Sequence, residues 1–199
     1  GVRARIAKIF SKKVFYTSPF AYMARFKKSK IMPIGIDTEM FKRNRSIEKE
    51  KGFILSFGRI SPVKNIDVLI NALVELDKKG IEFEAYIYGN PTDRDRKYYE
   101  KTRDTARVLE HKNKVIFQRG ISYKEIPDIC NKASIFVNLT PSGSFDKAII
   151  EAMACETISI IENESLKGSV PPELFFDGSA ENLADRVEYI LSLSDEEME

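Results

Sequence analysis

The chain has 199 residues, of which 43% are hydrophobic and 31% are charged, a composition typical of a globular protein. This length supports one full hydrophobic core, which excludes a second complete domain. The formal net charge of +2 hides an uneven distribution, because residues 1–45 carry 12 Lys and Arg against 2 acidic residues, whereas the remaining residues carry 20 against 28.

The cysteines and the single histidine give little support to several classes of site. Cys130 and Cys155 lie in apolar stretches without metal-ligand spacing, so we expect both to be buried in a reducing compartment. His111 follows a charged helical pattern, and we expect it at an exposed helix end rather than in a catalytic triad. No stretch approaches the roughly 20 apolar residues that span a bilayer, and the first residues lack a signal-peptide hydrophobic region. We therefore expect a cytoplasmic protein.

Residues 1–41 differ from the rest of the chain. Their pattern predicts a basic helix, a short strand over 14–18 and a helix over 19–26, and these elements resemble the tail of a preceding domain. Six aromatic residues are interleaved with the basic ones, namely Phe10, Phe15, Tyr16, Phe20, Tyr22 and Phe26. The pattern is open to two interpretations: a surface for nucleic acid or an anionic membrane, or a solvated helix pair whose aromatic side chains face a core. We favour the second. Residues 42–51 are polar or charged except for Ile47, which predicts an exposed connector at the start of the main domain, residues 42–199.

From residue 52 onward, short apolar runs alternate with amphipathic stretches, a pattern typical of an α/β domain with a parallel sheet and helices on both faces. The strands are expected at 52–57, 83–88, 114–117, 134–138 and 157–161. Helices are expected at 65–79, 93–111, 123–132, 145–155 and 180–193. The helix at 65–79 shows the apolar spacing most clearly and stops at Gly80.

The loop after the first strand of this domain has the composition of an anion-binding site. Gly58 allows close approach of the backbone, and Arg59 and Lys64 follow before the next helix. In open α/β sheets, ligands bind at the carboxyl ends of the strands, so both cations are expected on the ligand side. They could neutralise a diphosphate as negative charge grows on it, without a metal ion. The alternative is an ordinary loop with two surface cations.

A second candidate segment follows the strand at 134–138. Small polar residues lead into a helix whose free backbone N–H groups favour an anion, and Asp146 stands in its first turn, where it could also serve only to stabilise the helix. Glu151 is unusual because its neighbours in the helix are apolar, and a buried carboxylate requires hydrogen-bond donors, which a ribose diol would supply. The alternative is a surface glutamate paired with Lys147.

Three segments together resemble the GT-B glycosyltransferases of family 4, also called group 1. They are "PIGIDTEMF" (33–41), "ILSFGRISPVKNIDVLINAL" (54–73) and the stretch from Val115 to Ile160. The resemblance implies the donor-binding, C-terminal Rossmann-like half of a retaining enzyme that needs no bound metal. It implies that Arg59 and Lys64 hold a nucleotide-sugar diphosphate, that Glu151 binds the ribose, and that Gly120-Ile121-Ser122 contacts the base. The turn Gly143-Ser144-Phe145-Asp146 would lie against the donor sugar.

The resemblance also implies partners and has gaps. The donor would be a UDP- or GDP-sugar, and a glycan or lipid-linked acceptor would bind mainly to an N-terminal domain, with contact to the cytoplasmic face of an anionic membrane but not to nucleic acid. The family motif carries two glutamates, and Gly143 stands where the first is expected. Glu156 and Ile158 replace a usual Gly and Pro, and Glu156 is expected near the donor site without a role. A non-catalytic nucleotide-sugar-binding or partner-binding module of the same fold is therefore the alternative.

Overall fold

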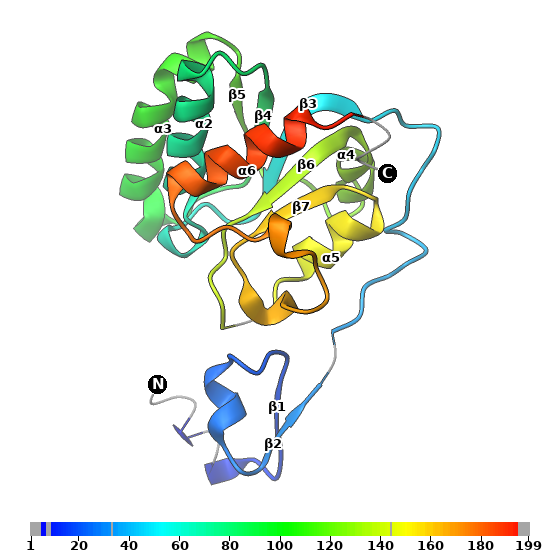
Figure 1. Ribbon diagram of the computed structural model, residues 1–199. Helices are drawn as coiled ribbons and strands as arrows, with labels where there is room; N and C mark the ends of the chain where they lie inside the picture. Colours follow the sequence, from blue (N-terminus) through cyan, green and yellow to red (C-terminus); the bar gives the residue numbers. More distant parts are fainter. Residues whose placement is uncertain (1–4, 7–8, 33, 144, 195–199) are drawn as a thin grey trace.

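The structure is a computed structural model that describes residues 5–6, 9–32, 34–143 and 145–194. Its main domain is built on a five-stranded sheet in which all neighbouring strands are parallel. The strands are β3 (Glu50–Phe57), β4 (Glu84–Tyr88), β5 (Val115–Gln118), β6 (Ala133–Asn138) and β7 (Ile158–Ile161). Their order across the sheet is β5-β4-β3-β6-β7 (Figure 1). The predicted α/β class with a parallel sheet is therefore confirmed.

Helices cover both faces of the sheet. On one face lie α2 (Ile66–Lys78), α3 (Arg96–His111) and α6 (Ala180–Ser192), and on the other lie α4 (Ile126–Lys132) and α5 (Lys147–Ala154) (Figure 1). Side chains of β3 alternate between the two resulting cores, with Ile54 in the first and Phe53 and Leu55 in the second. This alternation explains why the strand reads as a continuous apolar run.

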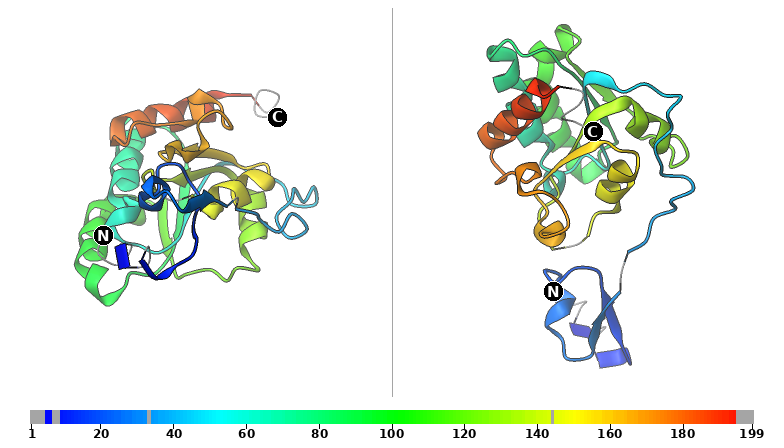
Figure 2. Two further views of the ribbon diagram at one scale, coloured as in Figure 1. Left: turned by 90° about the horizontal axis from the view of Figure 1, so that it is seen from below. Right: turned by 45° about the vertical axis from the view of Figure 1, so that its right-hand side comes forward.

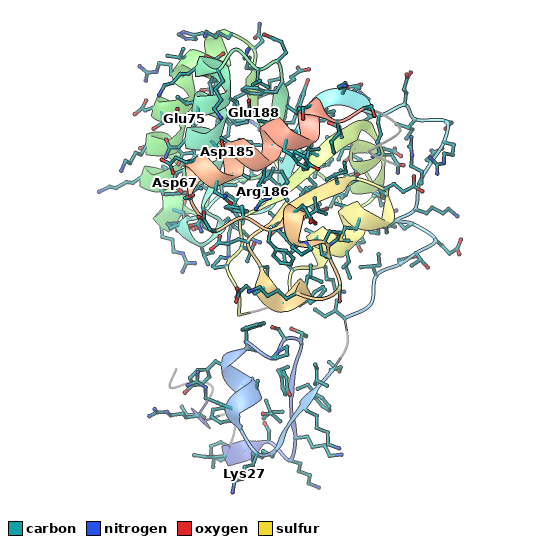
Figure 3. The ribbon with its side chains drawn as sticks, viewed as in Figure 1. Lys27, Asp67, Glu75, Asp185, Arg186 and Glu188 are labelled. Atoms are coloured by element: carbon teal, nitrogen blue, oxygen red, sulfur yellow. The ribbon has the colours of Figure 1, made fainter. Side chains whose placement is uncertain are left out.

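The ends of the helices differ by a few residues from the predicted ones. A short 3-10 turn, Asp93–Asp95, precedes α3, and α4 begins three residues later than expected. His111 is the last residue of α3 and is exposed, as predicted. Beyond the end of α2, Lys79 donates to Asp185 at 3.0 Å and to Glu188 at 2.6 Å, which connects α2 to α6. Both acids lie on α6 (Figure 3).

A small unit precedes the main domain. β1 (Val14–Tyr16) and β2 (Ser29–Ile31) pair in parallel and are joined by a chain segment with one 3-10 turn, Tyr22–Arg25, so the full helix predicted over 19–26 is wrong. A short helix depends on burying an apolar face, and Phe20 here is 49% exposed. Figure 2 shows this unit as a small body beside the domain, and a hydrogen bond of 2.6 Å between the Ser18 and Ser165 hydroxyls joins the two. The predicted basic helix falls partly on residues 1–4 and 7–8, which lie outside the described residues.

The aromatic residues of this unit do not share a core. Phe10 is 84% exposed and Phe15 is 52% exposed, so the expectation that the aromatic side chains face a core is wrong for these two and for Phe20. Tyr22 and Phe26 instead contact each other edge to face, with their ring centroids 5.5 Å apart.

The connector over 42–49 is more firmly held than its composition predicts. The buried Asn131 accepts at Oδ1 from the Asn44 backbone N–H at 2.7 Å and from Arg43 at 3.0 Å. Lys49 donates to the Ala133 carbonyl at 2.9 Å. Most of the connector is exposed, as expected, but these bonds bind it along the edge of the domain.

Candidate functional site

The site lies where β3 and β6 end side by side. The chain leaves β3 toward β4 on one side of the sheet and leaves β6 toward β7 on the other, so the strand order reverses between them. At such a switch point the loops after the two strands diverge and leave a crevice at the carboxyl edge of the sheet. The loop after β3 carries Gly58, Arg59 and Lys64, and the loop after β6 carries Thr140 and Asp146. These loops are the two segments that were predicted from the sequence to bind an anion.

The loop after β3 turns sharply over its neighbour. Gly58 has φ +141°, a conformation that favours glycine, and its N–H donates to the Tyr88 carbonyl at 2.9 Å. A Cβ on Gly89 would lie 1.9 Å from the Gly58 carbonyl oxygen, so Gly89 is required for this close approach. Gly89 was not predicted from the sequence, because the contact depends on the pairing of β3 with β4.

Lys64 reaches across the crevice to the second loop. Its Nζ donates to Asp146 Oδ2 at 2.6 Å and to Thr140 Oγ1 at 2.8 Å, and the Lys64 and Asp146 side chains are 24% and 17% exposed. Asp146 also accepts from Asn138 at 3.1 Å and from Thr140 at 2.9 Å, and its other oxygen caps α5 by accepting from the Ala148 N–H at 3.3 Å. The helix-stabilising role weighed for Asp146 is therefore observed, together with an ion pair to Lys64.

This arrangement fixes the charge of Asp146. Burial raises the pKa of the carboxyl, but hydrogen bonds from Lys64, Asn138 and Thr140 outweigh it, and the pKa lies below its ordinary value. An ionised carboxylate at the first turn of α5 also suits the positive end of the helix.

Arg59 is the free cation of the site. The side chain is exposed, and it makes no hydrogen bond or ion pair with any described part of the chain. Together with Gly58, Lys64, Tyr88, Asn138 and Thr140 it lines a small pocket at the switch point. A guanidinium left unpaired at the mouth of a pocket is available to an anion.

Glu151 is buried, not at the surface. It is 4% exposed, and its Oε1 accepts from the Tyr123 hydroxyl at 3.0 Å, whereas no ion pair joins it to the exposed Lys147. The alternative of a surface pair with Lys147 is therefore wrong. Burial raises the pKa of the Glu151 carboxyl above its ordinary value, and the hydrogen bond from Tyr123 offsets only part of this rise.

The loop predicted to contact the base lies beside Glu151. Gly120 follows β5 and approaches Asn90, whose Nδ2 would be 3.1 Å from an added Cβ. Ile121 packs into the same core as α5, and Ser122 is held by Glu125, which accepts from its backbone N–H at 3.2 Å. Tyr123, the next residue, joins this loop to Glu151. Tyr123 was not predicted as a site residue, although its place directly after the predicted base loop is a signal for it.

The residues of the turn before α5, which were predicted to contact the donor sugar, differ in their surroundings. Ser144 lies outside the described residues, and Phe145 is half-buried against the core beneath α4 and α5. Gly143 has φ +141°, while no atom lies within 4 Å of the place where a Cβ would stand. A glutamate here would be strained by backbone conformation rather than by lack of space.

Glu156 does not lie near this site. α5 carries the chain from the carboxyl edge of the sheet to the amino edge, and Glu156 follows its far end, where it pairs with Arg45 at 3.0 Å and Arg43 at 3.8 Å. The expectation of a position close to the donor was wrong, because a helix of eight residues separates the two ends.

The protein-family comparison assigns this architecture. The family model described as "Glycosyl transferases group 1" matches residues 37–199, which include both loops, Glu151 and the whole sheet. The chain belongs to this family. A curated relative from Caenorhabditis elegans, named GDP-Man:Man(3)GlcNAc(2)-PP-Dol alpha-1,2-mannosyltransferase, is 29% identical over 117 residues. That match covers 56% of this chain and 25% of the relative, so the chain spans only a fraction of the relative's length.

Solved structures of glycosyltransferases share the fold. HepE from Anabaena, crystallised with UDP and glucose, superposes with a TM-score of 0.83 at 18% identity, covering 99% of this chain and 57% of HepE. Sucrose-phosphate synthase from Thermosynechococcus elongatus gives 0.77 at 23% identity, covering 99% and 53%. The C-terminal domain of LpcC, a group 1 protein from Francisella tularensis, gives 0.70 at 23% identity, covering 82% and 90%. The fold is therefore the Rossmann-like half of a GT-B glycosyltransferase.

Two searches of the described residues were negative. No three or more His, Cys, Asp or Glu side chains gather closely enough there to hold a metal ion. Within the same residues, no helix is both long and apolar enough to cross a membrane.

Proposed function

We propose that the chain binds the nucleoside diphosphate of a UDP- or GDP-sugar, and that the whole enzyme transfers the sugar, with retained anomeric configuration, to a glycan or lipid-linked acceptor. The observation that carries the proposal is that two cations, the unpaired Arg59 and Lys64, line the same pocket at the switch point of the sheet. Relatives support it by their names: HepE was crystallised with UDP and glucose, and the mannosyltransferase is named for a GDP-linked donor.

The two cations have different roles in this proposal. A lysine ammonium has three N–H donors, and Lys64 gives two of them to Thr140 and Asp146. One donor remains for a phosphate oxygen, and Asp146 holds the ammonium in place. Arg59 has no such anchor, so its planar fork can adapt to the second phosphate. As the bond to the sugar breaks, both cations stabilise the charge that develops on the leaving diphosphate, which makes a metal ion unnecessary.

The nucleoside would lie along α5 and the loop after β5. Hydroxyl groups of the ribose would donate to Glu151, and the backbone of Gly120-Ile121-Ser122 would contact the base. The turn of Gly143, Ser144, Phe145 and Asp146 would face the donor sugar. This order follows the carboxyl edge of the sheet from β6 past β3 toward β5.

We further propose that residues 1–41 comprise the tail of an acceptor-binding domain and an inter-domain segment, and that residues 42–199 form the donor-binding domain. The paired strands β1 and β2 share no sheet with β3–β7, which supports the division. The isolated LpcC domain covers 82% of this chain, whereas HepE covers 99%. The exposed basic and aromatic side chains of this unit are candidates for contact with an anionic membrane at the cytoplasmic face.

A binding module without catalysis is the second candidate. The position where the family motif carries its first glutamate is Gly143, whose φ of +141° disfavours any side chain. Transfer of sugar by the full-length protein, assayed with UDP- and GDP-sugars, separates an enzyme from such a module.

The binding site itself is tested by Arg59→Ala. Removing the guanidinium is expected to weaken UDP or GDP binding by about 1.5–3 kcal/mol, the range of a hydrogen bond to a charged group, without loss of stability. Calorimetric titration with both nucleotides measures this. Arg107→Ala is the matched control, since Arg107 is exposed on α3 and pairs with Asp104 at 2.6 Å. Equal affinities of the Arg59 variant and the wild type would contradict the assignment.

A further inference from the structure

The segment at which the family match begins folds into a compact turn. The Asp37 carboxylate accepts from the N–H groups of Glu39 at 3.0 Å and Met40 at 3.2 Å, and its carbonyl accepts from the Phe41 N–H at 2.8 Å. An aspartate that bonds its own following backbone favours such a turn. The turn directs Phe41 into the domain, where it is 1% exposed.

Phe41 meets the tyrosine of the base loop. The ring centroids of Phe41 and Tyr123 are 5.3 Å apart and the rings are tilted by 59°. Tyr123 is 50% exposed, so Phe41 covers one part of its ring while the rest faces solvent. Aromatic pairs at this distance contribute about 0.5–1.5 kcal/mol beyond their burial, enough to restrict where the tyrosine ring lies.

The tyrosine in turn holds Glu151. Its hydroxyl donates to Glu151 Oε1 at 3.0 Å, which is the one hydrogen bond of this carboxylate within the described residues. The second oxygen, Oε2, is left for other donors. A carboxylate with one oxygen occupied presents the remaining oxygen in a fixed direction, as a ligand with two adjacent hydroxyls would require.

We propose that Tyr123, supported by Phe41, is a positioning residue that aims Glu151 at the ribose diol and links the segment 37–41 to donor affinity. The proposal rests on the proposed function, in which Glu151 binds the ribose. Three parts of the chain meet in this contact: the segment before the connector, the loop after β5, and α5. A shift of the segment 37–41 that withdraws Phe41 releases the tyrosine and lowers donor affinity.

The experiment removes one hydroxyl from the protein and two from the ligand. The 199-residue chain is titrated with UDP and GDP, and whichever binds more tightly is compared with its 2′,3′-dideoxy form. Tyr123→Phe is expected to weaken binding of the intact nucleotide about 3- to 10-fold, the effect of one hydrogen bond. It is expected to leave binding of the dideoxy form unchanged, because that ligand no longer uses Glu151. A loss of general structure would weaken both ligands alike.

Phe41→Leu provides the second arm. It keeps an apolar side chain in the core but removes the aromatic contact, and we expect the same ligand-selective loss at a smaller, 2- to 4-fold size. Tyr86→Phe is the matched control. It also removes a tyrosine-to-glutamate hydrogen bond, of 2.9 Å to Glu84, but toward the amino end of β4.

The outcomes separate the two proposals. If the wild type binds neither UDP nor GDP, the proposed function is overturned and the positioning role with it. If the wild type binds but Tyr123→Phe changes neither ligand, or changes both by the same factor, the positioning role is overturned while nucleotide binding stands.

Discussion

Asp146 and Glu151 are two carboxylates at the start and in the middle of the same helix, the first partly and the second almost fully buried, and their surroundings are opposite. Asp146 receives hydrogen bonds from Lys64, Asn138, Thr140 and the helix backbone, and its pKa is lowered. Glu151 receives one from Tyr123, and its pKa is raised by burial. The hydrogen bonds of Asp146 come from within the protein, whereas burial of the Glu151 carboxylate lowers the stability of the folded state.

The difference indicates which of the two has capacity for a ligand. A carboxylate surrounded by donors contributes to stability and has little to offer a substrate. A carboxylate with unmet hydrogen-bonding capacity gains when donors arrive with a ligand, and this gain supports binding. Sites that bind ligands frequently carry such strain, which the rest of the fold compensates.

Removal of Lys64 is expected to have the largest effect on the difference between the two carboxylates. Lys64→Met leaves Asp146 without its cation in a largely enclosed place, and we expect a loss of about 2–3 kcal/mol in the free energy of unfolding, measured by urea titration. A loop lysine that only contacted phosphate would cost far less.

Two further variants check that interpretation. Lys147→Met is the control, because Lys147 is exposed, adjacent to Asp146 in sequence, and makes no ion pair with any residue that the structure describes. Adding Asp146→Asn to Lys64→Met removes the stranded charge and is expected to recover part of the loss. An unchanged stability of Lys64→Met would mean that the ion pair contributes nothing.

The pairing of Lys64 with Asp146 also marks the limit of what the sequence could predict. The periodicity of 66–78 and the apolar strands gave the elements and the fold class, because local spacing encodes them. The contact between Lys64 and Asp146 joins residues 82 positions apart and exists only because β6 lies next to β3. Strand order is a global property, and neither loop carries a signal for it.

Other residues of the site could be predicted from the sequence. The six apolar neighbours of Glu151 within α5 correctly singled it out as a buried acid. Its donor, Tyr123, is half-exposed in a loop and has no distinctive apolar spacing, so only its place directly after the predicted base loop points to it. The misplacement of Glu156 was avoidable, since a helix that begins at the ligand edge must end at the opposite one.

The second variant sharpens the comparison at Glu151. Glu151→Gln keeps an acceptor for Tyr123 but removes the buried charge. We therefore expect the free energy of unfolding at neutral pH to rise by about 1–1.5 kcal/mol while nucleotide affinity falls. The charges of Lys147 and Asp146 also act on Glu151, the first lowering and the second raising its pKa. Thermal or urea unfolding and calorimetry measure the two effects separately.

The stability contributions of Glu151 and Asp146 are expected to change in opposite directions with pH. The folded pKa of Glu151 lies above the ordinary value of 4.5, so the cost of its charge is present at neutral pH and disappears as pH falls through the raised pKa toward 4.5. The advantage of Glu151→Gln should therefore shrink over that window. Asp146 behaves oppositely: its lowered pKa means that its contribution is full above 3.8 and is lost as pH falls further. A glutamine variant less stable than the wild type at neutral pH would show that Glu151 is structural.

The smallest effect concerns a third acid, Glu156, just beyond the other end of α5. Its φ of +55° lies in the left-handed region, which a side chain disfavours by about 1–2 kcal/mol. Its ion pairs with Arg43 and Arg45 are half-exposed and contribute little. Glu156→Gly and Glu156→Ala both remove these pairs, but only glycine relieves the backbone. We therefore expect Glu156→Gly to exceed Glu156→Ala in stability by roughly 0.5–1 kcal/mol, after the greater freedom of unfolded glycine is included. Equal stabilities would mean that the turn relaxes around alanine. Because Glu156 lies at the amino edge of the sheet, nucleotide affinity should be the same in both variants, which separates this acid from Asp146 and Glu151 at the ligand edge.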